Sequence, residues 1–166
     1  MTENKDNAMT PLHVAAYNCD LDVVRKLLES GTHPDVCDKN GFTPLHWCAF
    51  RGLVGTQQHL IAEALLEAGA DANACTTPGD CVLNFAIESG NQKLVEVLLS
   101  KGADVNMVAN DVTPLMTAAR VGDKDIIEML LQVGANPNAE VGGFHAYDYA
   151  DHYGHGEIVL LLKPGV

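Results

Sequence analysis

Apolar residues recur along this chain in clustered pairs at helical spacing. Two matching sets are Val23, Val24, Leu27 and Leu28, and later Ile126, Ile127, Leu130 and Leu131. Residues three and four positions apart share one side of an α-helix, so each set predicts an amphipathic helix with one buried face. Alanines recur in the segments before these sets, where their small side chains would allow helices to approach closely: Ala15, Ala16, Ala49, Ala86, Ala118, Ala119 and Ala150. The pattern indicates a stack of helices that bury one another's faces.

A tetrapeptide marks the start of each alanine segment. It reads Thr-Pro-Leu-His at residues 10–13 and 43–46, ends in Met at residues 113–116, and is degenerate at residues 81–84 and 145–148. Threonine can cap a helix, and proline suits the first helical turn. Glycines then follow the later apolar sets, where a helix is expected to end: Gly31, Gly69, Gly102 and Gly134. The chain therefore repeats with a period of about 33 residues.

This motif, at this period, resembles the ankyrin repeat. The resemblance implies an all-α solenoid of helix-turn-helix units with β-hairpin finger loops, in a single domain of residues 1–166. The expected units span about 5–37, 38–75, 76–107, 108–139 and 140–163, with a five-residue insertion near 53–58 and a tail at 164–166. The insertion either lengthens the link between two helices or adds a turn to the second. In the family the motif histidine bonds the backbone of the neighbouring turn, so His13 and His46 are expected to be structural.

Composition favours an ordinary soluble domain. The chain is 47% hydrophobic, with a mean hydropathy near zero. No apolar run approaches the roughly 18 residues of a membrane span, and the first residues lack the apolar stretch of a signal peptide. We expect an intracellular monomer, in the cytoplasm or nucleus if the source is eukaryotic.

The five cysteines are expected to be free thiols. Cys37 and Cys75 lie at corresponding finger sites of neighbouring units, farther apart than the about 7 Å between Cα atoms that a disulfide tolerates. Cys19, Cys48 and Cys81 replace glycine, alanine and threonine of the repeat pattern. No Cys-x-x-Cys motif occurs, so the sequence indicates neither a zinc knuckle nor a redox pair.

Catalytic and metal-binding signals are weak. Three histidines near the end, His145, His152 and His155, could hold zinc, but two of them occupy polar positions of the repeat. Phosphate-loop, dinucleotide and nucleophile-elbow motifs are missing from the sequence. Asp148 and Asp151 form a carboxylate pair at helical spacing without companions, which favours a solvated helix face. We expect no enzyme, no metal and no cofactor.

The resemblance implies a concave binding face made by the finger tips and the first helix of each unit. Family contact positions fall just before the tetrapeptide and seven or eight residues after its start. Trp47, beside them, replaces a usual leucine and is expected in the core. The candidate partner-binding residues are Tyr17, Asn18, Lys39, Asn40, Phe42, Phe50, Arg51, Asp80, Glu88, Asn110, Arg120, Phe144, His152 and Tyr153.

Charge narrows the class of partner. The formal net charge is −12, and residues 52–92 contain no Lys or Arg. Such a surface repels phosphate backbones, which disfavours nucleic acid and favours a protein with a basic or mixed surface. The alternative, that surface acids only aid solubility, stays open.

The sequence therefore predicts a protein-protein interaction module that acts as an adaptor, a scaffold or a steric inhibitor. The alternative is a substrate of the asparaginyl hydroxylase that acts on ankyrin fingers. Asn73 and Asn106 resemble its sites, because each follows a leucine by eight residues and an aspartate by two. An enzyme or a metal-binding accessory protein is a third, weaker hypothesis.

Overall fold

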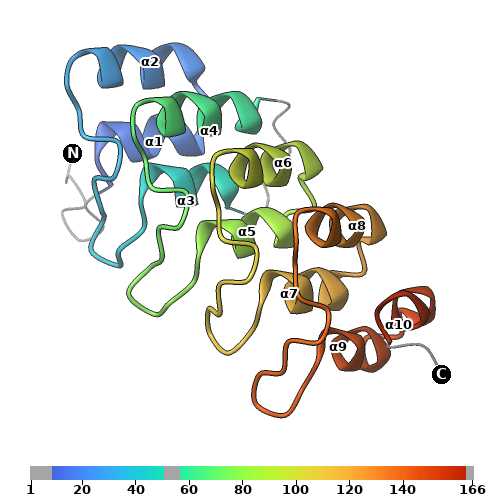
Figure 1. Ribbon diagram of the computed structural model, residues 1–166. Coiled ribbons are helices and arrows are strands. Elements are labelled where there is room, and N and C mark those ends of the chain that lie inside the picture. Colours follow the sequence, from blue (N-terminus) through green and yellow to red (C-terminus); the bar gives the residue numbers. More distant parts are fainter. Residues whose placement is uncertain (1–8, 51–56, 164–166) are drawn as a thin grey trace.

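The computed structural model describes residues 9–50 and 57–163 and shows an all-α solenoid (Figure 1). Its helices form two rows. The inner row holds the short helices α1 (Pro11–Tyr17), α3 (Pro44–Ala49), α5 (Val82–Glu88), α7 (Pro114–Val121) and α9 (Ala146–His152). The outer row holds α2 (Leu21–Glu29), α4 (Gln58–Glu67), α6 (Gln92–Ser100), α8 (Lys124–Gln132) and α10 (Gly156–Leu162). Neighbouring helices pack side by side along the inner row, and along the outer row from α2 to α8. Finger loops project beyond the inner row (Figure 1). The predicted fold class is confirmed.

Local chemistry explains where these helices begin. Pro44 and Pro114 open α3 and α7, and the hydroxyls of Thr43 and Thr113 accept hydrogen bonds from backbone N–H groups three residues on. Three of the outer helices, α2, α6 and α8, are capped in the same way by Asp20, Asn91 and Asp123. Each cap satisfies one of the N–H groups that a helix leaves free at its start.

The core lies between the two rows. Leu12, Leu45, Leu65, Leu98 and Leu130 are fully buried, and so are the alanines of the inner helices. Small residues at these positions let successive inner helices pack closely, as the alanine pattern predicts. Each unit contacts mainly its neighbours, which is the packing expected of a solenoid.

The fingers are hairpins of two lengths. Those at residues 38–42 and 75–81 place a glycine, Gly41 or Gly79, at positive φ before the chain returns. Those at 109–112 and 141–144 turn through two residues, both at positive φ: 48° and 58° for Asn110 and Asp111. This tight turn needs left-handed geometry twice, which Asn, Asp and Gly tolerate best. The fourth and fifth fingers are therefore two-residue hairpins.

The insertion near 53–58 falls mostly on residues 51–56, which lie outside the described residues. Helix α4 has 10 residues, against 9 in α2, α6 and α8, so the insertion does not add a full turn to that helix. Within residues 9–50 and 57–163, no helix has the length and apolarity that crossing a membrane requires.

Candidate functional site

Two buried histidines fix the fingers to the helices. The Nδ1 atom of His13 accepts from the Thr10 N–H at 3.0 Å, and its Nε2 donates to the Phe42 carbonyl at 2.9 Å in the next finger. His46 makes the same two bonds: its Nδ1 accepts from the Thr43 N–H, and its Nε2 donates to the Asp80 carbonyl. Burial lowers the pKa of His13, and lowers the pKa of His46 to about 4. Both imidazoles are therefore neutral at pH 7, and their predicted structural role is confirmed.

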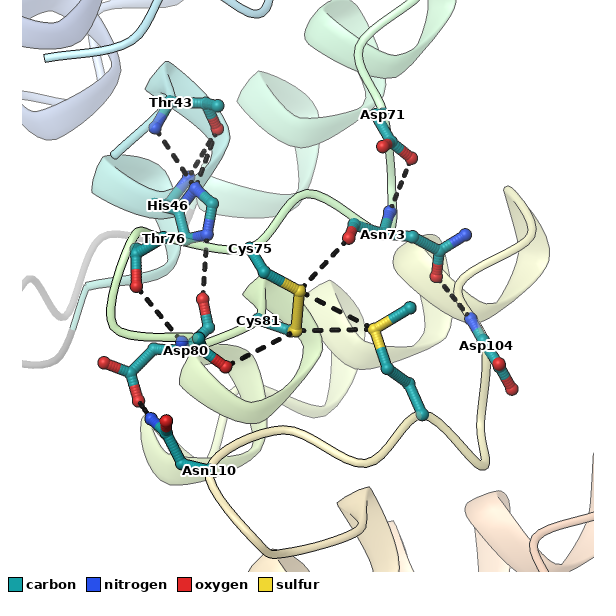
Figure 2. Close-up of a disulfide and its surroundings, with 12 residues drawn as sticks. Thr43, His46, Asp71, Asn73, Cys75, Thr76, Asp80, Cys81, Asp104 and Asn110 are labelled. Atoms are coloured by element: carbon teal, nitrogen blue, oxygen red, sulfur yellow. Dashed lines mark hydrogen bonds between the residues drawn. A yellow bond between two sulfur atoms is a disulfide. The ribbon is translucent and has the colours of Figure 1, made fainter. Parts of the chain in front are cut away.

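Asn73 and Asn106 form a ladder along the base of the fingers. The Asn73 side chain accepts from the Asp104 N–H at 2.7 Å (Figure 2). It also donates to the Gly102 carbonyl at 3.2 Å. Asn106 makes the equivalent bonds to Asn136 and Gly134. Asp35 occupies the same position in the first unit and accepts from the Asp71 N–H. These amides connect neighbouring units, and hydroxylation at them stays a prediction.

The expectation of five free thiols is wrong at the third finger. Cys75 and Cys81 pair across this hairpin, with Cα atoms 4.1 Å apart, and form a disulfide (Figure 2). Our sequence argument compared corresponding sites of successive units and overlooked two cysteines at opposite ends of one hairpin. The Met107 sulfur packs against both sulfurs at 3.6 and 3.4 Å. The three other cysteines are free thiols: Cys19, Cys37 and Cys48.

Five aromatic rings form one cluster across the first three units. Phe42 contacts Trp47 and Phe85, with ring centroids 5.5 and 5.7 Å away. Tyr17 and Phe50 contact Trp47 on either side, at 5.7 and 5.6 Å. Trp47 is half-buried and donates from its indole nitrogen to Asp38 at 3.2 Å, so it belongs to this surface cluster and not to the core. Phe50 leaves 37% of its surface in solvent. We call these five residues the aromatic cluster.

Four polar candidates bond one another between units. The Asn110 amide donates to the Asp80 carboxylate, which joins the third finger to the fourth (Figure 2). The Arg120 guanidinium donates to the Glu88 carboxylate, which joins the end of α7 to the end of α5. All four side chains are at least partly exposed, so each pair contributes at most about 1 kcal/mol. These pairs connect the third unit to the fourth.

A second group of candidates meets in the fifth unit. Phe144, Tyr149, His152 and Tyr153 line a hollow of about 490 Å³, together with Asp148 and Asp151. Phe144 and Tyr153 are 56% and 52% exposed. Asp148 and Asp151 were expected on a solvated helix face, and Asp151 is exposed; three aromatic rings and an imidazole line the same hollow. We call it the fifth-unit hollow.

The remaining candidates are simpler. Asn18, Lys39 and Asn40 are exposed, and the Asn40 carbonyl accepts from the Thr77 N–H at 3.2 Å in the next finger. Arg51 lies outside the described residues. The sequence analysis missed Phe85 and Tyr149. The signal was present, because both occupy the position four residues after the motif start, the position that Trp47 fills in the second unit.

The three C-terminal histidines have separate surroundings. His145 starts α9 and stacks on Tyr147, His152 contacts Tyr153, and His155 bonds the Arg120 carbonyl at 3.2 Å. Within the part of the chain that the structure describes, no group of three or more His, Cys, Asp or Glu side chains is placed to hold a metal ion.

Comparison with known proteins agrees with this architecture. A family model described as "Ankyrin repeats (3 copies)" matches residues 1–74, 54–141 and 83–165. The chain is also similar to a protein named "IkB-like protein" from African swine fever virus (isolate Tick/Malawi/Lil 20-1/1983). That similarity is 41% identity over 58 residues, or 34% of this chain and 24% of the viral protein.

Proposed function

The chain belongs to the ankyrin-repeat family, and we propose that it binds a partner protein through the face made by its finger tips and inner helices. Ankyrin repeats are in general non-catalytic protein-protein interaction modules. The proposal for this chain concerns which surface binds, and what kind of partner it takes.

The observation that carries the proposal is the aromatic cluster. Large apolar side chains that remain partly exposed are the usual anchors of protein interfaces. Phe50 is exposed although it contacts Trp47 and Phe85, and Tyr17 and Phe42 are only half-buried. The rings come from three inner helices, α1, α3 and α5, and from the residues beside α3. The histidine and asparagine bonds hold the fingers in place, so this surface is ordered before a partner arrives.

The charges favour a basic or mixed protein surface as the partner. Acidic side chains outnumber basic ones, and the net charge of −12 speeds association with a positive patch. We propose a monomer that acts inside the cell as an adaptor, scaffold or steric inhibitor, without a catalytic role and without binding nucleic acid or membrane. The viral relative matches over 58 residues only, so its name supports a protein-binding role and no particular partner.

The test compares two surface variants in one capture experiment. The first variant, Phe50→Ala with Phe144→Ala and Tyr153→Ala, removes exposed rings from the proposed face. The control, Leu160→Ala with Val133→Ala, removes large apolar side chains that are 83% and 51% exposed on or beside the outer helices. We leave Phe42 in place, because it is less exposed than Phe50 and packs against His46 as well as Trp47 and Phe85, so its loss would disturb the fold.

A partner captured from native-host lysate would be purified and titrated against each variant by calorimetry. We expect the first variant to bind at least about tenfold more weakly and the control to bind like the wild type. Equal binding by the first variant, or weakening by the control, would place the interface elsewhere.

A further inference from the structure

The fifth-unit hollow differs from the corresponding place in every earlier unit. The position six residues after the motif start is apolar and fully buried in four units: Ala16, Ala49, Ile87 and Ala119. In the fifth unit this position is Asp151, which is exposed. Asp148 likewise takes the position of His13, His46 and Met116, which are all buried. A further unit stacked in the same way would bury the Asp151 carboxylate, at a cost of several kcal/mol unless a cation came with it.

The charge in the hollow is available to a ligand. Asp148 accepts from the His145 N–H at 2.7 Å through one carboxylate oxygen. Asp151 makes no side-chain hydrogen bond or ion pair within residues 9–50 and 57–163. Residues 125–162 contain no Lys or Arg, and Lys163 lies over the Tyr147 ring, 6.0 Å from its centroid. A cation that enters the hollow therefore meets two carboxylates and little competition from this chain's own cations.

The walls of the hollow suit a flat cation. Phe144 and Tyr149 stand edge to face, with centroids 6.3 Å apart and planes at 65°, and Tyr153 stands at 76° to His152. Rings at such angles present both a face and edges to one small group. A guanidinium stacks on aromatic faces and donates two parallel hydrogen bonds to a carboxylate, whereas an ammonium is a strongly hydrated point charge. The hollow, of about 490 Å³, is open enough to admit a side chain from outside.

We propose that the fifth-unit hollow receives an arginine side chain of a partner protein, with the guanidinium against the rings of Phe144, Tyr149 and Tyr153 and bonded to Asp151. This inference rests on the proposed protein-binding function, and names the chemical group that this end of the face recognises. At the aromatic cluster, by contrast, the Asp38 carboxylate is already bonded to the Trp47 indole and to the turn of its own finger.

The test uses short peptides, so it does not depend on knowing the partner. Acetylated, amidated Gly-Gly-Arg-Gly-Gly is titrated into the full chain, and the aromatic and amide signals of the fifth unit are followed by NMR. The matched peptides contain citrulline, which is neutral and has nearly the same shape, or lysine. The matched protein variants are Asp151→Asn, in the hollow, and Asp22→Asn, an exposed aspartate on α2.

We expect saturable shifts at Tyr149 and Tyr153 with the arginine peptide. Binding should be about fivefold weaker for the citrulline and lysine peptides and for Asp151→Asn, and unchanged for Asp22→Asn. Three results would overturn the proposal: citrulline or lysine binding as tightly as arginine, shifts centred on the aromatic cluster, or no saturable shift up to about 20 mM peptide.

The peptide and capture experiments separate the two proposals. If a partner is captured and lost by the three-ring variant, but the arginine peptide does not bind, the protein-binding function stands and the arginine assignment fails. If the peptide binds as expected but no partner depends on the exposed rings, the hollow binds arginine and the proposed protein-binding face is wrong.

Discussion

Cys75 and Cys81 are joined by a disulfide that closes the third finger between two interaction networks. On one side the Asn73 ladder reaches the fourth finger, and on the other the Asp80 carbonyl accepts from His46 (Figure 2). Cys75 is exposed and Cys81 is buried. The bond therefore constrains the segment through which the second, third and fourth units are connected.

Breaking this disulfide should destabilise the protein. Closing a loop of this length restricts the unfolded chain by about 2 kcal/mol, so we expect Cys75→Ser to lower the free energy of unfolding by about that amount without reductant. Urea unfolding with and without a phosphine reductant measures this, and reductant should remove the difference. Cys37→Ser is the control, because Cys37 is a free, exposed thiol at the equivalent finger site of the second unit. Identical wild-type unfolding curves with and without reductant would contradict the prediction.

His46 should make stability depend on pH in a defined window. Its pKa is about 4 in the folded protein, mainly because of burial, against an ordinary value near 6.5. Between these values the unfolded chain binds more protons than the folded one. The contribution of His46 to the free energy of unfolding is therefore complete above pH 6.5. It falls as the pH drops and is lost by about pH 4, for a total of about 3 kcal/mol.

Urea unfolding between pH 7 and pH 4 tests this against His46→Gln. The variant should be less stable at pH 7, because it loses the bond to the Asp80 carbonyl, but its stability should fall less steeply with decreasing pH. Parallel curves for the two proteins would show that His46 does not titrate differently on folding.

Cys19 carries a backbone strain that glycine would relieve. It has a φ of 56°, in the left-handed region that glycine occupies at the equivalent positions 90, 122 and 154. We expect Cys19→Gly to raise the free energy of unfolding by about 1 kcal/mol, because a side chain in this region is sterically crowded. Thermal and urea unfolding measure the gain. Cys19→Ala keeps the Cβ atom and should give no such increase; an equal gain from both would assign the effect to the lost thiol.

Thr117 holds a buried hydroxyl that lacks a hydrogen bond within the described residues. It is 1% exposed on α7, at the repeat position of Trp47, Phe85 and Tyr149. Replacing it with valine removes an unsatisfied polar atom, so we expect Thr117→Val to stabilise the protein by about 1 kcal/mol. Thr113→Val is the opposite case, because the Thr113 hydroxyl caps α7 and its loss should cost about 1 kcal/mol. If urea unfolding shows a loss for Thr117→Val, the hydroxyl has a partner in solution.

Much of the architecture could be predicted because each repeat specifies itself locally. Threonine caps, prolines at helix starts and left-handed glycines act within a few residues, and the His13 and His46 bonds reach only the adjacent unit. The positions of Phe50, Phe144 and Tyr153 followed from the same register, and all three are exposed. Arg51 and most of the insertion fall outside the described residues, so those expectations stay untested.

The sequence alone determined the solenoid and the rows of buried leucine and alanine, because a repeat that buries its face against a copy of itself needs only its period and its pattern. Tertiary structure decided which side chains meet between units. The Cys75–Cys81 bond, the Glu88–Arg120 pair and the fifth-unit hollow depend on how each hairpin turns and how each unit sits on the last. Spacing along the chain assigns a residue to a face, but only the packed units bring its partner within bonding distance.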